Sequence, residues 1–143
     1  MENREKLVKD IFQKGRGILN PIFERNGFKY FNKSSGNSSG GHFISGEYRK
    51  VDREIEFSYR GSLGLVIYRL GDLSLDHETY MTFLGVKDRS KYPGFPKNPI
   101  DSFNDLAYDL ENFSGDFLKG SGQEFVKFAK QFLKNPEIFK GVP

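Results

Sequence analysis

A two-residue alternation in the middle of the chain constrains the fold more than any other feature. Apolar Ile55, Phe57 and Tyr59 alternate with polar Glu54, Glu56, Ser58 and Arg60. Because successive side chains of a strand point to opposite faces, this pattern predicts a strand over 53–60 with one buried and one wet face. Only Val51 and Asp52 separate it from a second strand-like segment, His42 to Lys50, so the two are predicted to pair as an antiparallel hairpin.

Segments on both sides extend this hairpin into a meander. Phe28 to Phe31 has strand-forming residues, and Ser34 to Gly41 consists only of Ser, Gly and Asn, which predicts a flexible hairpin loop. Gly61 to Gly64 predicts a turn. Leu65 to Tyr68 is apolar without interruption, which predicts a central strand covered on both faces. We therefore expect an antiparallel sheet of about four strands.

Helical patterns flank the strands. An amphipathic stripe from Leu7 to Phe23 passes through Gly15 and predicts a long N-terminal helix, kinked or broken before Pro21. Ser74 or Asp76 is expected to cap a short helix over 77–84.

Two further helices are expected after the proline-rich stretch 87–99. The first opens at Ser102, and the second opens at Ser121 with a capping box and has Leu133 on its inward face. Since strands cluster between helices, the prediction is one α+β domain over 1–143, an antiparallel meander covered by the N-terminal and C-terminal helices.

The composition indicates what kind of core the domain has and in which compartment it is expected. The 143 residues include 15 Phe and no Cys, which predicts one aromatic core and excludes disulfides and thiolate chemistry. The N-terminus is charged, without the apolar run of a signal peptide, and no stretch approaches the roughly 20 apolar residues of a membrane span. A cytoplasmic protein without a membrane segment is the expectation.

The charge pattern includes two features that could mark binding surfaces, a pair of oppositely charged segments and a set of tyrosine–arginine pairs. Asp101 to Asp116 is acidic and Lys119 to Lys140 is basic, which we interpret as two helices with mutually attractive solvated faces rather than as partner-binding patches. Arginines follow Tyr48, Tyr59 and Tyr68, a weak nucleic-acid pattern. Glutamates in the same strands would repel phosphate and the net charge is only +3, so nucleic acid is not expected as a partner.

Signals for catalysis are weak. The two histidines, His42 and His77, lie in no recognised catalytic or zinc-binding spacing, and the polar run 72–78 is explained by helix capping. The glycine-rich stretches 36–41 and 61–64 match no phosphate-binding loop. We predict no catalytic residue, no metal ligand and no cofactor.

Four residues remain as candidates for ligand binding: Arg60, Arg69, His77 and Glu78. The two arginines flank the predicted central strand and could receive a carboxylate or phosphate, although pairing with neighbouring acids is the simpler use. In the alternative hypothesis, a small-ligand domain or hydrolytic enzyme has a cleft around His77 and Arg60.

The stretch from Glu54 to Tyr68, continuing through Leu75 to Met81, resembles an uncharacterised bacterial family of domains of unknown function. The order of elements, with a helix leading to Asn26, Gly27 and Phe28, is also similar to cytoplasmic immunity-type proteins of toxin systems. The first resemblance implies an α+β domain without assigned chemistry. The second implies a protein that neutralises a bacterial toxin.

These observations favour a non-enzymatic binding protein. Its expected partner is a protein, with a toxin as the specific candidate, bound through the charged helices or the sheet edge. The sequence does not predict an oligomeric state.

Overall fold

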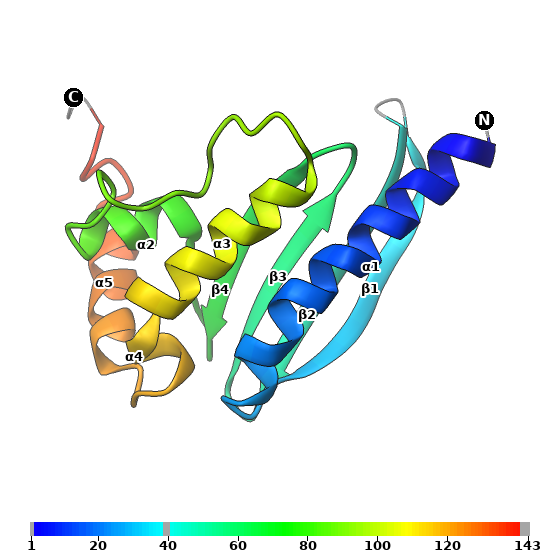
Figure 1. Cartoon of the computed structure of the whole chain (residues 1–143). Helices are drawn as coiled ribbons and strands as arrows, with labels where there is room; N and C mark the ends of the chain where they lie inside the picture. The colour runs from blue at the N-terminus through cyan, green and yellow to red at the C-terminus, as the bar shows by residue number, and fades with distance from the viewer. Residues whose placement is uncertain (1, 39–40, 141–143) are drawn as a thin grey trace.

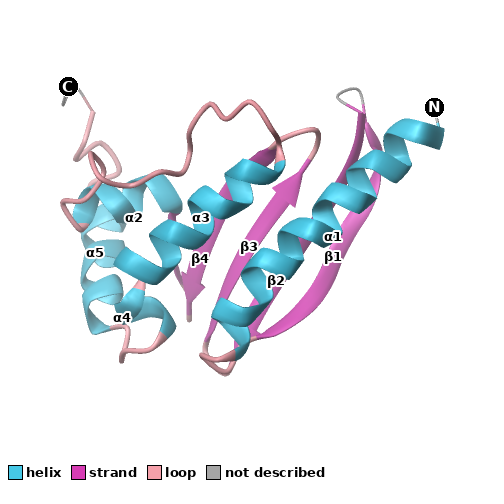
Figure 2. Cartoon of the chain, viewed as in Figure 1, coloured by secondary structure: helices cyan, strands magenta, loops and turns pink. Residues whose placement is uncertain are grey.

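A five-stranded antiparallel sheet carries helices on one side (Figures 1 and 2). The computed structural model describes residues 2–38 and 41–140. Its elements are α1 (Glu2–Glu24), β1 (Lys29–Ser38), β2 (Gly41–Lys50), β3 (Arg53–Tyr59), β4 (Leu63–Leu70), β5 (Leu73–Asp76), α2 (His77–Phe83), α3 (Ile100–Phe113), α4 (Gly115–Leu118) and α5 (Gln123–Lys134). The predicted α+β class is confirmed.

The strands follow one another in space as they do in sequence, β1-β2-β3-β4-β5, so the sheet is the predicted meander. Val51 and Asp52 connect β2 to β3, as expected, and Val51 adopts a positive φ of 34° in this tight turn. The sheet has five strands rather than about four, because Leu73–Asp76 pairs with the end of β4. The sequence pattern of this segment indicated only the start of a helix.

Most of the predicted flexible loop is strand. Ser34 to Ser38 pairs with Ser45 to Gly41 in continuous register, so the loop prediction is wrong for the described part of 34–41, and residues 39–40 lie outside it. Ladder hydrogen bonds join backbone groups and need no apolar side chain. Polar cross-strand contacts add to them: the Ser34 and Ser45 hydroxyls lie 2.6 Å apart, and His42 Nδ1 lies 3.1 Å from Asn37 Oδ1.

Only one face of the sheet is covered. Alternate side chains of β2, β3 and β4 pack under the helices and are buried, among them Tyr48, Ile55, Phe57, Val66 and Tyr68. The opposite face carries no element of the described chain, and Leu65 there is 62% exposed. The prediction that 65–68 is covered on both faces is therefore wrong, because all the helices pack on the same side (Figure 1).

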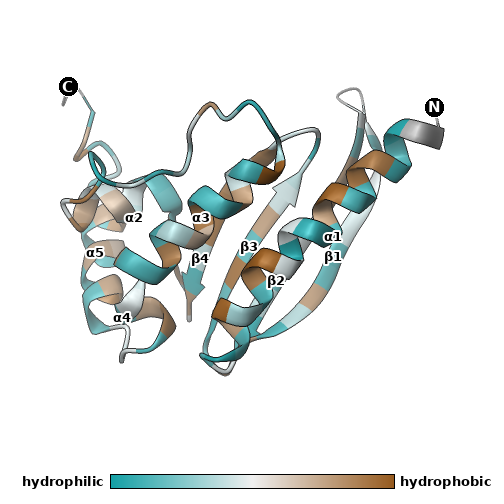
Figure 3. Cartoon of the chain, in the orientation of Figure 1, coloured by the Kyte–Doolittle hydropathy of each residue, from teal (hydrophilic) through white to brown (hydrophobic). Residues whose placement is uncertain are grey.

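α1 and α3 are amphipathic, as the alternation of brown and teal along them shows (Figure 3), and apolar residues of both helices are buried in the core. α1 is continuous through Pro21, so the predicted break is absent. Gly15 lies against the ring of Phe103 on α3, so closely that a Cβ at residue 15 would overlap the ring. A glycine thus sets the distance between these two helices.

α2, α3 and α5 lie where helices were predicted, whereas the short α4 was not predicted and not all the predicted caps form. Asp76 caps α2 by accepting a hydrogen bond from the Thr79 N–H at 2.8 Å. α3 starts at Ile100, before Ser102, and has no side-chain cap. Ser121 accepts only from the Gln123 N–H at 3.2 Å, so the full capping box does not form. Leu133 is 74% exposed rather than inward.

Candidate functional site

A polar cluster lies inside the core between β4, α2 and α3. Nε2 of His77 lies 2.8 Å from Oδ2 of Asp109, and Nδ1 lies 2.7 Å from the Tyr68 hydroxyl. The Tyr68 hydroxyl is also 3.0 Å from Oγ of Ser114. Because an ionised carboxylate only accepts, the Nε2 nitrogen of His77 donates to Asp109. We call Tyr68, His77, Asp109 and Ser114 the buried polar cluster.

Every member of the buried polar cluster is closed off from solvent. Asp109 is fully buried, and His77 is 2% exposed. The Asp109 carboxylate also accepts hydrogen bonds from the backbone N–H groups of Lys91 and Tyr92, at 2.8 and 2.9 Å. The cluster therefore ties the segment between α2 and α3 to the core, a structural use of a Tyr-His-Asp arrangement.

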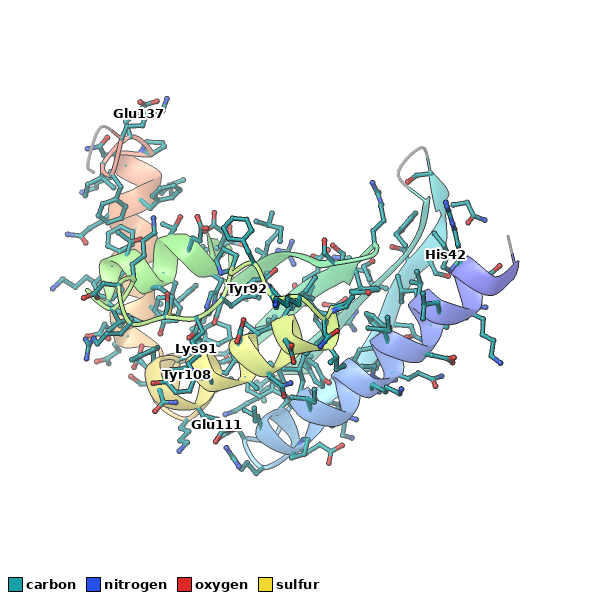
Figure 4. All side chains as sticks on the ribbon, turned by 45° about the horizontal axis from the view of Figure 1, so that its top comes forward. His42, Lys91, Tyr92, Tyr108, Glu111 and Glu137 are labelled. Atoms are coloured by element: carbon teal, nitrogen blue, oxygen red, sulfur yellow. The ribbon has the colours of Figure 1, made fainter. Side chains whose placement is uncertain are left out.

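Figure 4 shows the same segment from above, with Lys91 and Tyr92 next to α3. The Lys91 ammonium lies 4.0 Å from the ring centroid of Tyr108, and the Tyr92 hydroxyl donates to the Leu63 carbonyl at 2.8 Å. Burial, followed by the negative charge of Glu78, raises the pKa of Tyr92 to about 12. Tyr92 is therefore neutral and acts as a structural donor.

The uncovered face of the sheet carries a chain of ion pairs across four strands. We call this face the open face. Its contacts run from Lys33 to Glu56 (2.8 Å), from Glu56 to Arg69 (2.7 Å), from Arg69 to Glu54 (3.6 Å), from Glu54 to Arg49 (3.7 Å) and from Arg49 to Glu47 (2.9 Å). Glu54 lies directly opposite Arg49 on β2 and Arg69 on β4, an arrangement that cross-strand pairing favours, whereas Lys33 reaches across β2 to Glu56 on β3.

The glutamates of the open face differ in their electrostatics. A hydrogen bond from Arg49 lowers the pKa of Glu47 to about 2, despite the burial of this carboxylate. The pKa of Glu54 is raised, chiefly by its hydrogen bond with Glu47 and then by burial. The two carboxylates thus share one site, and the arginine stabilises the charge on Glu47.

Apolar groups accompany these charges on the open face. Phe31 is 41% exposed, and the guanidinium of Arg49 lies over its ring at 4.4 Å. The Arg60 guanidinium lies 5.7 Å from the ring of Phe43. These two residues border a hollow of about 430 Å³ whose floor holds the small residues Ser45, Ser58 and Gly64. The open face therefore combines arginines, exposed apolar side chains and a hollow.

The four residues that the sequence singled out do not meet in one cleft. Arg69 lies on the open face in ion pairs with glutamates, and Arg60 borders the hollow on that same face. His77 lies on the opposite side of the sheet, inside the core, because it contacts Tyr68, the neighbour of Arg69 in β4. Glu78 is exposed in the first turn of α2. A shared cleft around His77 and Arg60 is not formed.

The other sequence patterns also separate in space. The nucleic-acid pattern would need tyrosines and arginines on one face, but Tyr48, Tyr59 and Tyr68 are buried beneath the helices. In the acidic segment, Asp109 is buried and Glu111 pairs with Arg25 at 3.1 Å. Within the described residues, no ion pair joins 101–116 to 119–140. No ion pair among the described residues therefore supports the predicted attraction between these two helix faces.

No family model, curated protein or solved structure matches this chain. Across residues 2–38 and 41–140, no helix is long and apolar enough to cross a membrane. Over the same residues, no cluster of His, Asp and Glu could hold a metal ion. The resemblances named from the sequence stay predictions.

Proposed function

We propose that this chain is a non-enzymatic binding protein that docks a partner protein on its open face. One observation carries the proposal: an uncovered sheet face where exposed Phe31 and Leu65 accompany Arg49, Arg60 and Arg69. Aromatic residues and arginine are enriched in protein interfaces, whereas the solvated face of an antiparallel sheet is mostly polar. The open face is therefore suited to contact the surface of a partner protein rather than to enclose a small substrate.

The charges of the open face indicate the chemistry of the partner. The cations Lys29, Lys33, Arg49, Arg60 and Arg69 outnumber the carboxylates Glu47, Glu54 and Glu56. Within the described part of the chain, Arg60 and Lys29 have no carboxylate at ion-pair distance. We therefore assign a partner whose contact surface is acidic around an apolar centre.

The immunity-type role is a specific form of this proposal, in which the partner is a cytoplasmic toxin covered by the open face. The acidic segment 101–116 supports it less than the sequence suggested. The Asp109 carboxylate is used inside the core and the Glu111 carboxylate pairs with Arg25, so neither is free to complement a basic toxin surface. The open face, with free cations, is the better supported surface.

Co-purification from the native host tests the proposal. The tagged chain is compared with Leu65→Asp, which places a charge in the open face, and with Leu133→Asp, the matched change at an exposed leucine of α5. We expect a partner, identified by mass spectrometry, that the wild type and Leu133→Asp retain and Leu65→Asp loses. Recovery of the chain alone, or equal capture by both variants, contradicts the proposal.

A further inference from the structure

A second hollow lies on the helix side of the sheet, between α1 and β1 and apart from the open face. We call it the α1–β1 pocket, and its volume of about 310 Å³ is at the lower end for small-molecule sites, roughly 300–1,000 Å³. α1 contributes Lys9, Gln13 and Arg16, and β1 contributes Asn32 and Ser35. The described residues that line the pocket include no Asp or Glu. Its wall is therefore cationic and rich in hydrogen-bond donors.

A β-bulge shapes this pocket. The register of β1 shifts between Asn32 and Ser34, which leaves Lys33 as the extra residue. The Lys33 side chain reaches the open face, where its ammonium pairs with Glu56 at 2.8 Å. Asn32 and Ser35, on the two sides of the bulge, line the pocket. Bulges commonly redirect side chains beside binding sites, and this one directs polar groups toward α1.

Arg16 is held in position by the sheet beneath it. Its guanidinium carbon lies 3.4 Å from the ring centroid of Tyr30, whose hydroxyl donates to Oδ1 of Asn32 at 2.9 Å. The Tyr30 ring has room only because residue 46 is glycine, since a Cβ there would overlap the ring. The cation is therefore oriented before a ligand arrives, which lowers the entropy lost on binding.

Of the three cations among the described lining residues, Arg16 and Lys9 are available to a ligand, whereas the third, Lys33, pairs with Glu56 on the open face. Within residues 2–38 and 41–140, no carboxylate lies at ion-pair distance from Arg16. A guanidinium whose charge no carboxylate neutralises favours an anionic ligand in the pocket. Among the described residues, Lys9 pairs only with exposed Glu5, at 3.0 Å, a weak contact that a ligand can replace.

We infer that the α1–β1 pocket binds a phosphate monoester, with the phosphate on Arg16 and Lys9 and the organic group against Phe12 and Ile44. A guanidinium binds phosphate oxygens through two parallel hydrogen bonds. The lining offers donors from both α1 and β1, and a phosphate has more acceptor oxygens to meet them than a carboxylate has. Phe12 and Ile44 supply the apolar part of the lining. This inference is independent of the docking function of the open face.

The test is a titration with phenyl phosphate, inorganic phosphate and acetate, followed by amide chemical shifts in NMR. We expect saturable shifts at the backbone amides of Gln13, Asn32 and Ser35, with phenyl phosphate binding more tightly than inorganic phosphate and acetate binding least. Arg16→Gln is expected to weaken binding about tenfold or more. Lys14→Gln, the same change of charge at an exposed position of α1, is expected to change it less than about twofold.

A second pair of variants keeps Arg16 and its stacking intact. Gln13→Glu places a carboxylate in the pocket and is expected to abolish phosphate binding, whereas Gln131→Glu on α5 is expected to leave it unchanged. Circular dichroism confirms that each variant is folded. Absence of saturable shifts, acetate binding as tight as phenyl phosphate, or equal binding by Gln13→Glu and Gln131→Glu would overturn the inference.

Discussion

Asp109 is the residue whose environment differs most from its sequence context. It belongs to an acidic run that indicates a solvated helix face, yet it is fully buried and accepts hydrogen bonds from three donors. The helical pattern places it between Leu106 and Leu110, close to the buried stripe. Its partner His77 lies 32 positions away in sequence. No local pattern reveals a contact of that separation, so the buried polar cluster could not be predicted.

Replacement of Asp109 by alanine is expected to lower the free energy of unfolding by about 3–5 kcal/mol, because it leaves buried donors without an acceptor. Urea denaturation measures this difference. The control is Glu111→Ala, which removes an exposed carboxylate from the same helix and is expected to cost at most about 1 kcal/mol. Equal losses for the two variants would show that the cluster does not stabilise the core.

Glu47 and Glu54 predict opposite effects of pH on stability. The pKa of Glu47 in the folded chain is about 2, below the usual 4.5. The ionised Glu47 carboxylate therefore stabilises the fold fully at pH values above 4.5, and this stabilisation is lost as the pH falls toward 2. The pKa of Glu54 is raised, so its ionisation in the folded state opposes folding as pH rises above the usual value.

Glu47→Gln is therefore expected to destabilise the chain more at about pH 7 than at about pH 3, and Glu54→Gln is expected to show the reverse trend. Urea denaturation at the two pH values checks both. The account of the shared carboxylate site fails if the two variants respond to pH in the same direction.

At the scale of elements, the contact of α1 with α3 depends on one small residue that lies within the predicted apolar stripe. That residue is Gly15, and the structure shows why a glycine stands there, since Phe103 occupies the space of a Cβ. At Gly17, two positions on, a Cβ would meet no atom within 4 Å. The two glycines of one helix thus have opposite roles.

Gly15→Ala is expected to destabilise the chain by about 1–3 kcal/mol through overpacking. Gly17→Ala is expected to stabilise it by about 0.5–1 kcal/mol, because alanine restricts the unfolded chain and favours helix. Thermal and urea unfolding of both variants check these signs. A stabilising Gly15→Ala would contradict the close approach of the two helices.

The strand content of β1 shows where sequence reasoning fails for an element. Ser34 to Ser38 has no apolar side chain, and the propensity of its residues indicates a loop. The structure pairs these residues with β2 through backbone groups, which composition does not record.

Hydrogen exchange distinguishes the two descriptions of this segment. Amides of Ser34 to Ser38 that face β2 are expected to exchange more slowly than the amides of Gly61 and Ser62, which lie in the bend between β3 and β4. Uniformly fast amide exchange over 34–38 would contradict the strand and support the flexible loop predicted from the sequence.

For the whole molecule, hydrophobic periodicity was sufficient to predict the class and the meander. The alternation at 53–60 correctly indicated one wet face, whereas the apolar run 65–68 indicated two covered faces. Periodicity reports how apolar a side chain is and not what covers it, so it could not show that Leu65 stays exposed. That exposure is the basis of the proposed docking surface, and it became visible only with the helices in place.

The docking surface is tested most directly by measuring how tightly two matched arginine variants of the chain bind the captured partner. Arg60 and Arg89 are both exposed and lie near phenylalanine rings, at 5.7 and 5.8 Å, but only Arg60 is on the open face. We predict that Arg60→Glu raises the dissociation constant about tenfold or more, whereas Arg89→Glu changes it less than about twofold. Equal effects of the two variants, or a larger effect of Arg89→Glu, would contradict docking on the open face.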